Sequence, residues 1–332
     1  MYNASEKWSV FYDLVAGKAK SLIDPATGLI DKKFTQQVNC PVCKSSSSAP
    51  YITKDGFTYV KCTGCSFIYS SPQLTSEAIE KAYNDIEIRS YFLNELLIPF
   101  VEQGQKKEFR ERLERISALI NSKTRRLLDV GCAAGNFLQI AGEMGYEAEG
   151  LELDDINVKY AKEKRNLNAH MITLEQMNYP EGSFDVVTLW DVLEHLSQPM
   201  QTLREISRVM RPGGILGLST INHACLNQRL LRSDWRYWMP PDHICSFTPP
   251  ILRKMLKDAR LAVFSEKHTY MFEVLEEARL HFLLFSSDSN LFSSLSNKAR
   301  KIVYVATAKL TQLIFGALKS GDIITIFARK ME

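Results

Sequence analysis

One stretch of the sequence, residues 127–138 (LLDVGCAAGNFL), constrains the fold more than any other. Its apolar start predicts a buried strand, and Gly131 and Gly135 predict a tight turn that leads into a helix. A second apolar run ends in a carboxylate, Glu152, twenty-one residues after Gly131. Glycines let a backbone approach a ligand closely, and a carboxylate at the tip of the next strand accepts hydrogen bonds from ribose hydroxyls. The layout predicts the nucleoside-binding half of a doubly wound α/β sheet.

The pattern of apolar residues extends this layout into a larger sheet. Strand and helix patterns alternate from residue 126 to residue 270, which predicts parallel strands covered by helices on both faces. With 332 residues, the chain is long enough for this domain and an accessory module. A hydrophobic content of 45% and a charged content of 24% are ordinary for a soluble globular protein.

Four segments carry a resemblance to a known family. Residues 129–135, with the spacing Asp-x-Gly-x-Ala-x-Gly, are similar to the first motif of class I S-adenosylmethionine-dependent methyltransferases. Ala133 departs from the glycine that the family often carries, which narrows the space beside the cofactor. Residues 182–196 (GSFDVVTLWDVLEHL) resemble the fourth strand and its following helix, and residues 211–219 (RPGGILGLS) resemble the fifth strand. The segment 240–248 (PPDHICSFT) is typical of one large branch of the family.

This resemblance implies a seven-stranded, mostly parallel Rossmann-like sheet over residues 122–332. The family's sheet ordinarily ends with two antiparallel strands joined by a short hairpin. The candidates are residues 261–270 and 322–328, which are separated by about fifty residues. The region 272–320 between them has a helical pattern and is expected to be an insertion.

The resemblance also implies that S-adenosylmethionine binds at the carboxyl edge of this sheet. Asp129 would face the amino group of its methionine moiety, and Glu152 would hold the ribose. Thr173 stands where many relatives carry an aspartate, so Glu175 or the Leu174 amide is expected at the adenine edge. The expected cofactor-binding residues are Asp129, Gly131, Ala133, Gly135, Glu152, Leu174, Glu175, Trp190 and Asp191.

Four of the seven cysteines form two C-x-x-C pairs with the spacing of a zinc ribbon. The predicted ligands are Cys40, Cys43, Cys62 and Cys65. Four thiolates can surround zinc tetrahedrally and leave no open position for catalysis, so the predicted role of the metal is structural. An unmetallated remnant and a redox site are the alternatives. The remaining cysteines are expected to be small buried hydrophobes, and they are Cys132, Cys225 and Cys245.

The sequence before the sheet divides into three further parts. Residues 1–37 are an expected N-terminal helical segment, in which apolar spacing predicts one amphipathic helix over residues 5–23. The zinc ribbon is expected at 38–75 and a helical linker at 76–121. The first thirty residues show no export segment, so we expect a cytoplasmic protein without disulfides.

Two histidines are candidates for removing a proton from the methyl acceptor. His195 follows Glu194 just after the fourth predicted strand, close to the edge where ligands bind. His243 lies in a loop that the resemblance places across the substrate mouth. The predicted catalytic residues are therefore His243, His195 and Glu194. The alternatives are structural: His195 caps a helix beneath the cofactor, and His243 anchors its loop.

The sequence narrows the acceptor without identifying it. We expect a hydroxyl or carbon of a sugar, a glycan precursor or another small metabolite, because the chain most resembles methyltransferases of bacterial polysaccharide and small-molecule biosynthesis. Trp235, Tyr237 and Trp238 are either a platform for a ring or buried anchors of their loop. The competing hypothesis is a zinc-bearing rRNA or tRNA base methyltransferase. A net charge of +3 argues against a nucleic-acid partner, and the intact cofactor motif argues against an inactive binding protein.

The expected insertion at 272–320 has three candidate roles. It is either a helical cap over the active site, a dimer contact or a shallow membrane-docking element. Its second half is too short and too often interrupted by polar residues for a transmembrane helix. Peripheral membrane contact would run through residues 298–318, where Lys298, Arg300 and Lys301 precede the apolar run. The oligomeric state stays open.

Overall fold

The computed structural model describes residues 4–83, 85–100, 106–120, 125–269 and 320–332. The helices are α1 (Ala4–Lys20), α2 (Ser76–Tyr83), α3 (Ile86–Tyr91), α4 (Ile98–Phe100), α5 (Lys106–Ser117), α6 (Asn136–Glu143), α7 (Asp155–Arg165), α8 (Leu174–Met177), α9 (Pro199–Val209), α10 (Leu226–Leu231) and α11 (Pro249–Asp258). The described residues also form the 3-10 helices η1 (Lys32–Phe34), η4 (Leu193–His195) and η5 (Arg232–Asp234) and the π-helix η2 (Phe92–Leu97). The strands are β1 (Thr35–Gln36), β2 (Ser48–Lys54), β3 (Phe57–Cys62), β4 (Ile68–Ser70), β5 (Gln73–Leu74), β6 (Arg126–Val130), β7 (Glu147–Glu152), β8 (Ala169–Met171), β9 (Phe184–Trp190), β10 (Met210–Ile221), β11 (Cys245–Ser246), β12 (Leu261–Thr269) and β13 (Ile323–Lys330).

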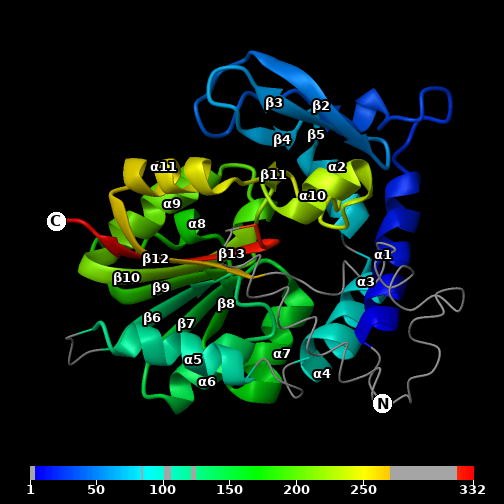
Figure 1. Cartoon of the computed structure of the whole chain (residues 1–332). Helices are drawn as coiled ribbons and strands as arrows, with labels where there is room; N and C mark the ends of the chain where they lie inside the picture. The colour runs from blue at the N-terminus through cyan, green and yellow to red at the C-terminus, as the bar shows by residue number, and fades with distance from the viewer. Residues whose placement is uncertain (1–3, 84, 101–105, 121–124, 270–319) are drawn as a thin grey trace, which may run out of the picture.

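A seven-stranded sheet forms the centre of the molecule (Figure 1). Its order is β12-β13-β10-β9-β6-β7-β8. Neighbours from β10 to β8 pair in parallel, whereas β13 is antiparallel to both β10 and β12. The predicted Rossmann-like fold with its terminal antiparallel pair is therefore confirmed. Because β6 and β9 lie side by side, the turns that leave their carboxyl ends are neighbours, as a nucleotide site requires.

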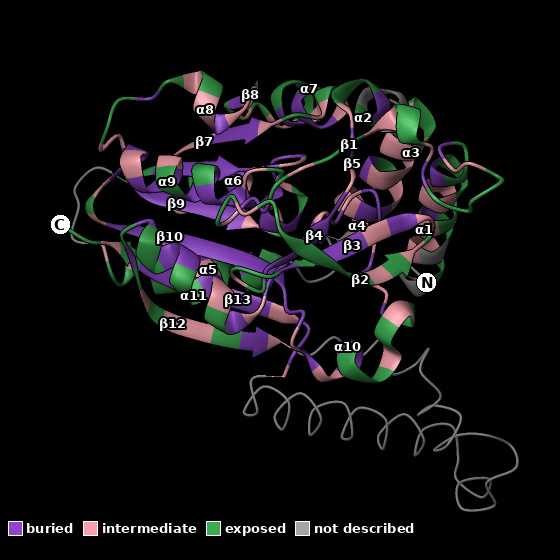
Figure 2. Ribbon diagram, turned by 90° about the horizontal axis from the view of Figure 1, so that it is seen from above, coloured by how far each residue is buried: buried purple, intermediate pink, exposed green. Residues whose placement is uncertain are grey.

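Helices cover both faces of this sheet. In Figure 1, α5 and α6 lie below it, and α9 and α11 lie above it. The central strands are buried along almost their whole length, as the purple arrows in Figure 2 show, and all but the last residue of β9 is buried. A strand enclosed on both faces must be apolar throughout rather than alternating, which explains the VVTL run at residues 186–189.

A small sheet lies over one end of the large one (Figure 1). It has the order β11-β4-β3-β2, with each neighbouring pair antiparallel. Three of these strands come from the predicted ribbon, but β11 belongs to the segment that follows the expected fifth strand of the large sheet. The ribbon is therefore hydrogen-bonded into the larger domain through main-chain atoms.

The N-terminal helices pack beside the edge of the large sheet where β7 ends. Trp8 and Phe11 of α1 contact the ring of Phe92 in the π-helix, with ring centroids 6.1 Å and 5.0 Å apart. Arg89 of α3 pairs with Asp154, just beyond the end of β7, at 2.7 Å between Nε and Oδ2. These contacts tie the segment before the sheet to the loop that follows Glu152.

The segment boundaries and the insertion stay predictions. The helix expected at 5–23 corresponds to α1, which ends at Lys20. The insertion predicted at 272–320 lies, apart from residue 320, outside the described residues, and so do its three candidate roles. Among the helices that the structure describes, none has the length and apolar character to cross a membrane.

Candidate functional site

The glycine-rich turn after β6 is fixed by packing. Gly131 and Gly135 have φ values of +76° and +77°, which L side chains rarely adopt. A Cβ on Gly131 would lie 2.3 Å from the Cγ2 atom of Val192, and a Cβ on Gly135 would lie 2.4 Å from the Cδ1 atom of Leu167. Ala133 adopts a left-handed φ of +45° despite its side chain. Positions 131 and 135 therefore require glycine, because the neighbouring side chains of Val192 and Leu167 leave no room for a Cβ atom.

Glu152 closes this turn from the neighbouring strand. Its Oε2 atom accepts a hydrogen bond from the amide of Ala133 at 2.9 Å. Its Oε1 atom accepts from the amides of Leu153, at 2.6 Å, and Asp154, at 3.0 Å. The carboxylate predicted to bind ribose thus also bridges the turns that follow β6 and β7. Oε1 already accepts from two amides, whereas Oε2 accepts from one and keeps a second lone pair, so this arrangement is compatible with one further hydroxyl donor.

Asp129 lies buried at the end of β6, with 2% of its surface exposed. Its Oδ1 atom accepts a hydrogen bond from the Thr188 hydroxyl at 2.6 Å. Burial, assisted by the charge of Glu152 and opposed by the hydrogen bond from Thr188, raises the pKa of Asp129 to about 7. A cation bound beside this carboxyl would favour its ionised form, so the position suits the ammonium group that the resemblance assigns to it.

The expected adenine-edge residues are arranged around α8. Thr173 and Gln176 form a capping box at the start of this helix, so Thr173 serves as a cap. The Glu175 carboxylate accepts a hydrogen bond from the Thr202 hydroxyl at 2.7 Å, and the Leu174 side chain is buried. Glu175 also lines a cavity of about 840 Å³, and Lys44, the residue after Cys43, lines the same cavity.

Trp190 and Asp191 diverge at the end of β9. The Trp190 ring contacts Phe137 of α6, with centroids 5.5 Å apart, and the guanidinium of Arg112 lies 4.4 Å from the ring. Asp191 has a left-handed φ of +54°, and its Oδ1 atom accepts a hydrogen bond from the Ser219 hydroxyl at 2.8 Å. Of these two residues, Asp191 is exposed and Trp190 is half-buried.

The structure brings Glu194, His195 and His243 together. A carboxylate oxygen of Glu194 and one ring nitrogen of each histidine all lie within 4.8 Å of one another. These atoms form a compact group that could share a proton or hold a divalent cation. Glu194 and His243 are buried, whereas His195 is exposed. The Glu194 carboxylate accepts a hydrogen bond from the Thr220 hydroxyl at 2.7 Å.

Main-chain carbonyls determine which nitrogen of each histidine is free. The Nδ1 atom of His195 lies 3.0 Å from the carbonyl oxygen of Asp242, and Nδ1 of His243 lies 2.9 Å from that of Tyr237. A carbonyl only accepts hydrogen bonds, so each Nδ1 carries a proton and donates. Each Nε2 atom of a neutral ring therefore retains its lone pair.

Burial separates the two histidines in their acid–base behaviour. Burial, assisted by the charge of His195 and partly opposed by the hydrogen bond to the Tyr237 carbonyl, lowers the pKa of His243 to about 3, so His243 is neutral at physiological pH. Burial raises the pKa of Glu194, partly opposed by His195 and assisted by Asp191. Of the two histidines, exposed His195 is the better placed to exchange a proton with an acceptor.

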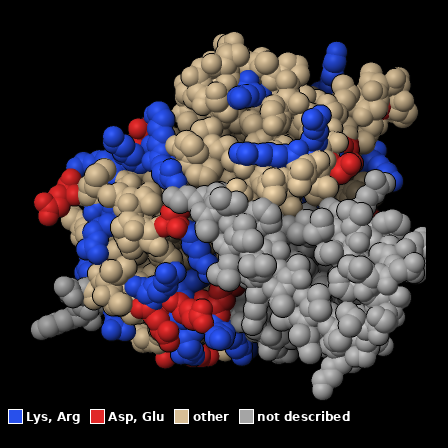
Figure 3. Space-filling model, viewed as in Figure 1, with Lys and Arg blue, Asp and Glu red and all other residues tan. Residues whose placement is uncertain are grey.

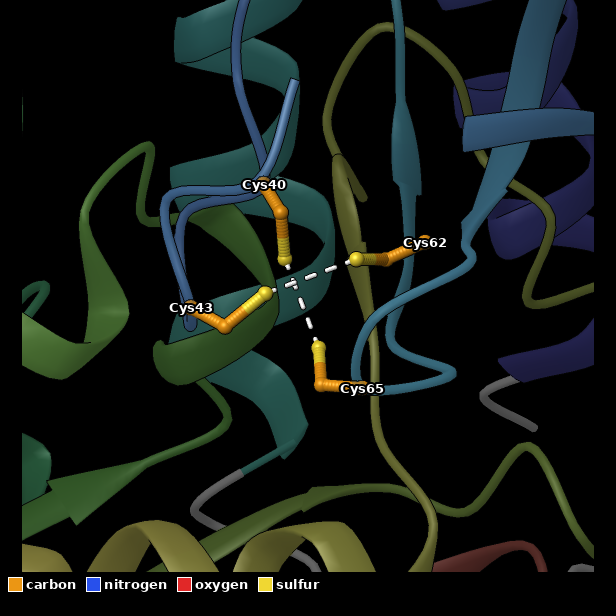
Figure 4. A group of neighbouring side chains, drawn as sticks. All are labelled: Cys40, Cys43, Cys62 and Cys65. Atoms are coloured by element: carbon orange, nitrogen blue, oxygen red, sulfur yellow. Dashed lines mark hydrogen bonds between the residues drawn. The ribbon is translucent and has the colours of Figure 1, made fainter. Parts of the chain in front are cut away.

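The four predicted zinc ligands converge to one point (Figure 4). The Sγ atoms of Cys40 and Cys65 are 3.5 Å apart, as are those of Cys43 and Cys62, and all four lie within 4.8 Å of one another. Four sulfurs at about 2.3 Å from a tetrahedral zinc ion would be about 3.8 Å apart. The observed spacing therefore fits zinc.

The two cysteine turns have the same backbone conformation. In each, the residue after the second cysteine is left-handed, with φ of 64° at Lys44 and 63° at Ser66. The amide of that residue donates to the carbonyl of the first cysteine, at 2.8 Å from Lys44 to Cys40 and 2.9 Å from Ser66 to Cys62. Two copies of one turn that face each other are the arrangement of a structural four-thiolate site.

Sequence reasoning missed three hydroxyl groups and one tyrosine in this region. Thr188, Ser219 and Thr220 lie within otherwise apolar strands and hold Asp129, Asp191 and Glu194 respectively. Isolated hydroxyl residues near the carboxyl ends of predicted buried strands are the signal that could have found them. Tyr59 contacts the main chain of His243 from the ribbon, a contact that no spacing in the sequence indicates.

Comparison with known proteins identifies the family to which this fold belongs. A family model described as "Methyltransferase domain" matches residues 100–266, half of the chain. The chain therefore belongs to this methyltransferase family.

Relatives with assigned names each match part of the chain. The chain is 32% identical over 117 residues to "Ubiquinone biosynthesis O-methyltransferase" of Xanthomonas oryzae pv. oryzae (strain PXO99A), covering 33% of this chain and 49% of that protein. It is 28% identical over 182 residues to the protein of the same name from Bradyrhizobium sp. (strain ORS 278), covering 52% of this chain and 70% of that one. The chain thus spans about half the length of the first of these relatives.

Among solved structures, a "SAM dependent methyltransferase from Archaeoglobus fulgidus" is similar with a TM-score of 0.46 and 20% identity. The match covers 68% of this chain and 94% of that one. "Haemonchus contortus Phosphoethanolamine N-methyltransferase 2 in complex with S-adenosyl-L-methionine" is similar with a TM-score of 0.45 and 18% identity, over 68% of this chain and 53% of that one.

We propose that the four thiols of the cysteine cluster hold one structural zinc ion per chain. Cys62→Ser removes one ligand, so we expect the metal content to fall well below one per chain and the ribbon to unfold, because it has little apolar core of its own. Elemental analysis and thermal unfolding measure both effects. Cys225→Ser, a change at a buried cysteine outside the cluster, serves as the control. Iron, or no metal, in protein purified under reducing conditions would contradict this proposal.

We propose that Glu152 binds the ribose of S-adenosylmethionine. Glu152→Ala would leave a ribose hydroxyl and the amides of Ala133, Leu153 and Asp154 without their acceptor. An unpaired donor costs about 1–3 kcal/mol, so calorimetry should show roughly tenfold weaker binding or more. Glu152→Gln keeps one acceptor oxygen and should lose less. Glu147→Ala, at an exposed position of the same strand, should bind normally. Unchanged affinity in Glu152→Ala would place the ribose elsewhere.

Proposed function

We propose that this chain is an S-adenosylmethionine-dependent methyltransferase that acts on a hydroxyl group of a small molecule. The family match supports methyl transfer, and the glycine turn beside Asp129 and Glu152 supports the cofactor. The observation that carries the choice of acceptor is the exposed His195, whose Nδ1 donates to the Asp242 carbonyl while Nε2 stays free. A hydroxyl acceptor must lose a proton during transfer, and a neutral imidazole can take it.

S-adenosylmethionine, when bound, supplies the methyl group and carries its own leaving group. The protein then needs to hold the acceptor oxygen in line with the bond that breaks and to receive its proton. Asp129 and Glu152 would fix the cofactor from two neighbouring strands, and Asp191 lies at the end of a third. His195 would receive the proton on Nε2, and the Glu194 carboxylate would stabilise the imidazolium that results.

Two observations bear on the acceptor class: the burial of the loop that carries Trp235 and Trp238, and the names of the relatives. The relatives' shared name, "Ubiquinone biosynthesis O-methyltransferase", supports oxygen as the acceptor atom. Trp235 and Trp238 are buried with 0% and 2% exposure, which supports a loop-anchoring role rather than a platform for a sugar ring. A sugar or glycan precursor, as in polysaccharide biosynthesis, remains our first acceptor class, with carbon as the alternative acceptor atom.

The RNA base methyltransferase is the second candidate, and charge weighs against it. On the face shown in Figure 3, the surface at the ribbon end of the molecule is mostly uncharged with a few Lys and Arg side chains, and at the lower left Lys and Arg mix with Asp and Glu. Phosphate backbones are bound by clustered positive charge, which a net charge of +3 does not suggest.

A methyl-transfer assay with labelled cofactor tests this proposal. We expect label on hydroxylated small molecules when nucleotide sugars, glycans, phenolic metabolites and total RNA are offered in parallel. Treatment with hydriodic acid distinguishes oxygen from carbon attachment, because it releases the methyl group of an ether as methyl iodide and leaves a methyl group on carbon in place. Robust labelling of RNA alone would favour the second candidate.

His195→Asn tests the proposed base. We expect kcat to fall by roughly 10²–10⁴ with little change in cofactor affinity, because the variant removes proton transfer and leaves Asp129 and Glu152 intact. His243→Asn should lower kcat less, because a group with a pKa of about 3 is a poor proton acceptor at neutral pH. His170→Asn, on the edge strand β8, is the control. Full activity in His195→Asn would leave positioning alone as the mechanism.

A further inference from the structure

The ribbon and the histidine-bearing loop share a continuous set of main-chain hydrogen bonds. Strand β11 pairs with β4 of the ribbon, with Cys245 opposite Tyr69 and Ser246 opposite Ile68. One residue earlier, the carbonyl of Ile244 accepts a hydrogen bond from the amide of Ser70 at 2.8 Å. The chain that follows His243 is therefore an edge strand of the ribbon's sheet.

Tyr59 extends this attachment to His243 itself. It lies within β3, it is completely buried, and its hydroxyl donates to the carbonyl of His243 at 2.8 Å. Its ring packs against Trp238, with centroids 4.5 Å apart. A buried hydroxyl with a short bond to a main-chain carbonyl fixes the position of that peptide more firmly than packing alone.

The opposite side of the same segment is attached to the proposed catalytic group. The amide of Ile244 donates to the carbonyl of Glu194 at 3.0 Å. The carbonyl of Asp242 accepts from Nδ1 of His195 at 3.0 Å. Residues 242–244 are thus held between the ribbon on one side and the turn of Glu194 and His195 on the other.

We infer that the ribbon is a positioning element of the active site, with Tyr59 as the positioning residue. This inference rests on the proposed function for the role of His195. Tyr59 and β4 hold the two peptide groups that follow His243. The carbonyl of Asp242, in the peptide group that precedes His243, orients the ring of His195. Because β3 ends at Cys62, a predicted zinc ligand, closure of the cysteine cluster holds the strand that carries Tyr59. Small displacements of a base from its acceptor lower the rate of proton transfer strongly.

Tyr59→Phe tests this inference without changing the shape of the core. It removes the hydroxyl and leaves the ring on Trp238. We expect kcat to fall roughly tenfold while the dissociation constant of S-adenosylmethionine and the metal content stay unchanged. Hydrogen exchange of the peptide that covers residues 240–247 should become roughly tenfold faster, while exchange of the cofactor turn at 131–136 stays the same.

Tyr51→Phe is the matched control. Tyr51 lies on the neighbouring ribbon strand β2, and its hydroxyl contacts Nε2 of His223 at 3.0 Å rather than the loop carbonyl. This variant should keep wild-type kcat and wild-type exchange at 240–247. Equal losses in the two variants would show that the ribbon only stabilises the domain, and wild-type kcat and exchange in Tyr59→Phe would refute the inference.

Two further measurements separate this inference from the proposed function. If wild-type protein transfers no methyl group to any acceptor, the proposed function fails, and the exchange experiment alone decides whether Tyr59 holds the loop. If Tyr59→Phe does not fold, stepwise zinc removal from the wild type replaces it. Exchange at 240–247 should then rise in proportion to the zinc lost, and unchanged exchange would overturn the inference.

Discussion

The pairing of β11 with β4 is the interaction on which the arrangement of this molecule depends. It is only two residues long, but it joins the ribbon's sheet to the segment that carries His243. Adjoining side chains complete the junction: Cys40, Cys62 and Phe67 from the ribbon pack in the same core cluster as Cys245 and Phe247. A ribbon of this size has too little apolar surface to be stable alone, so its fold and its attachment to the larger domain are mutually dependent.

Buried acidic groups dominate the electrostatics of the site. Asp129 and Glu194 are both buried at the carboxyl edge of the sheet, and burial raises the pKa of both. Each is bonded to a neutral hydroxyl, from Thr188 and Thr220 respectively, in place of a cation. Hydroxyl donors stabilise a carboxylate less than a positive charge does, so these sites retain an affinity for cations. A cofactor with an ammonium and a sulfonium group suits such an edge better than a neutral ligand does.

Much of this architecture could be predicted from the sequence because its signals are local. The glycine turn, the VVTL strand and the cysteine pairs each fix a conformation within a few residues, and all three agree with the structure. The edge strand β11 could not be predicted, since two residues show no periodicity and its partner lies about 175 residues earlier. The contact from Tyr59 to His243 was missed for the same reason, because long-range hydrogen bonds to a carbonyl leave no trace in residue spacing.

The glycine turn shows how one residue type satisfies two separate requirements. The sequence argument assigns Gly131 and Gly135 to close approach of a ligand, whereas the structure shows that each is already required by a neighbouring side chain, Val192 and Leu167. Val192 belongs to the same turn as Asp191 and precedes Glu194 by two residues. Contact with Gly131 therefore sets the distance between the cofactor turn after β6 and the acidic turn after β9. The two halves of the proposed site are held in register by packing before any ligand binds, which is the preorganisation that an in-line transfer needs.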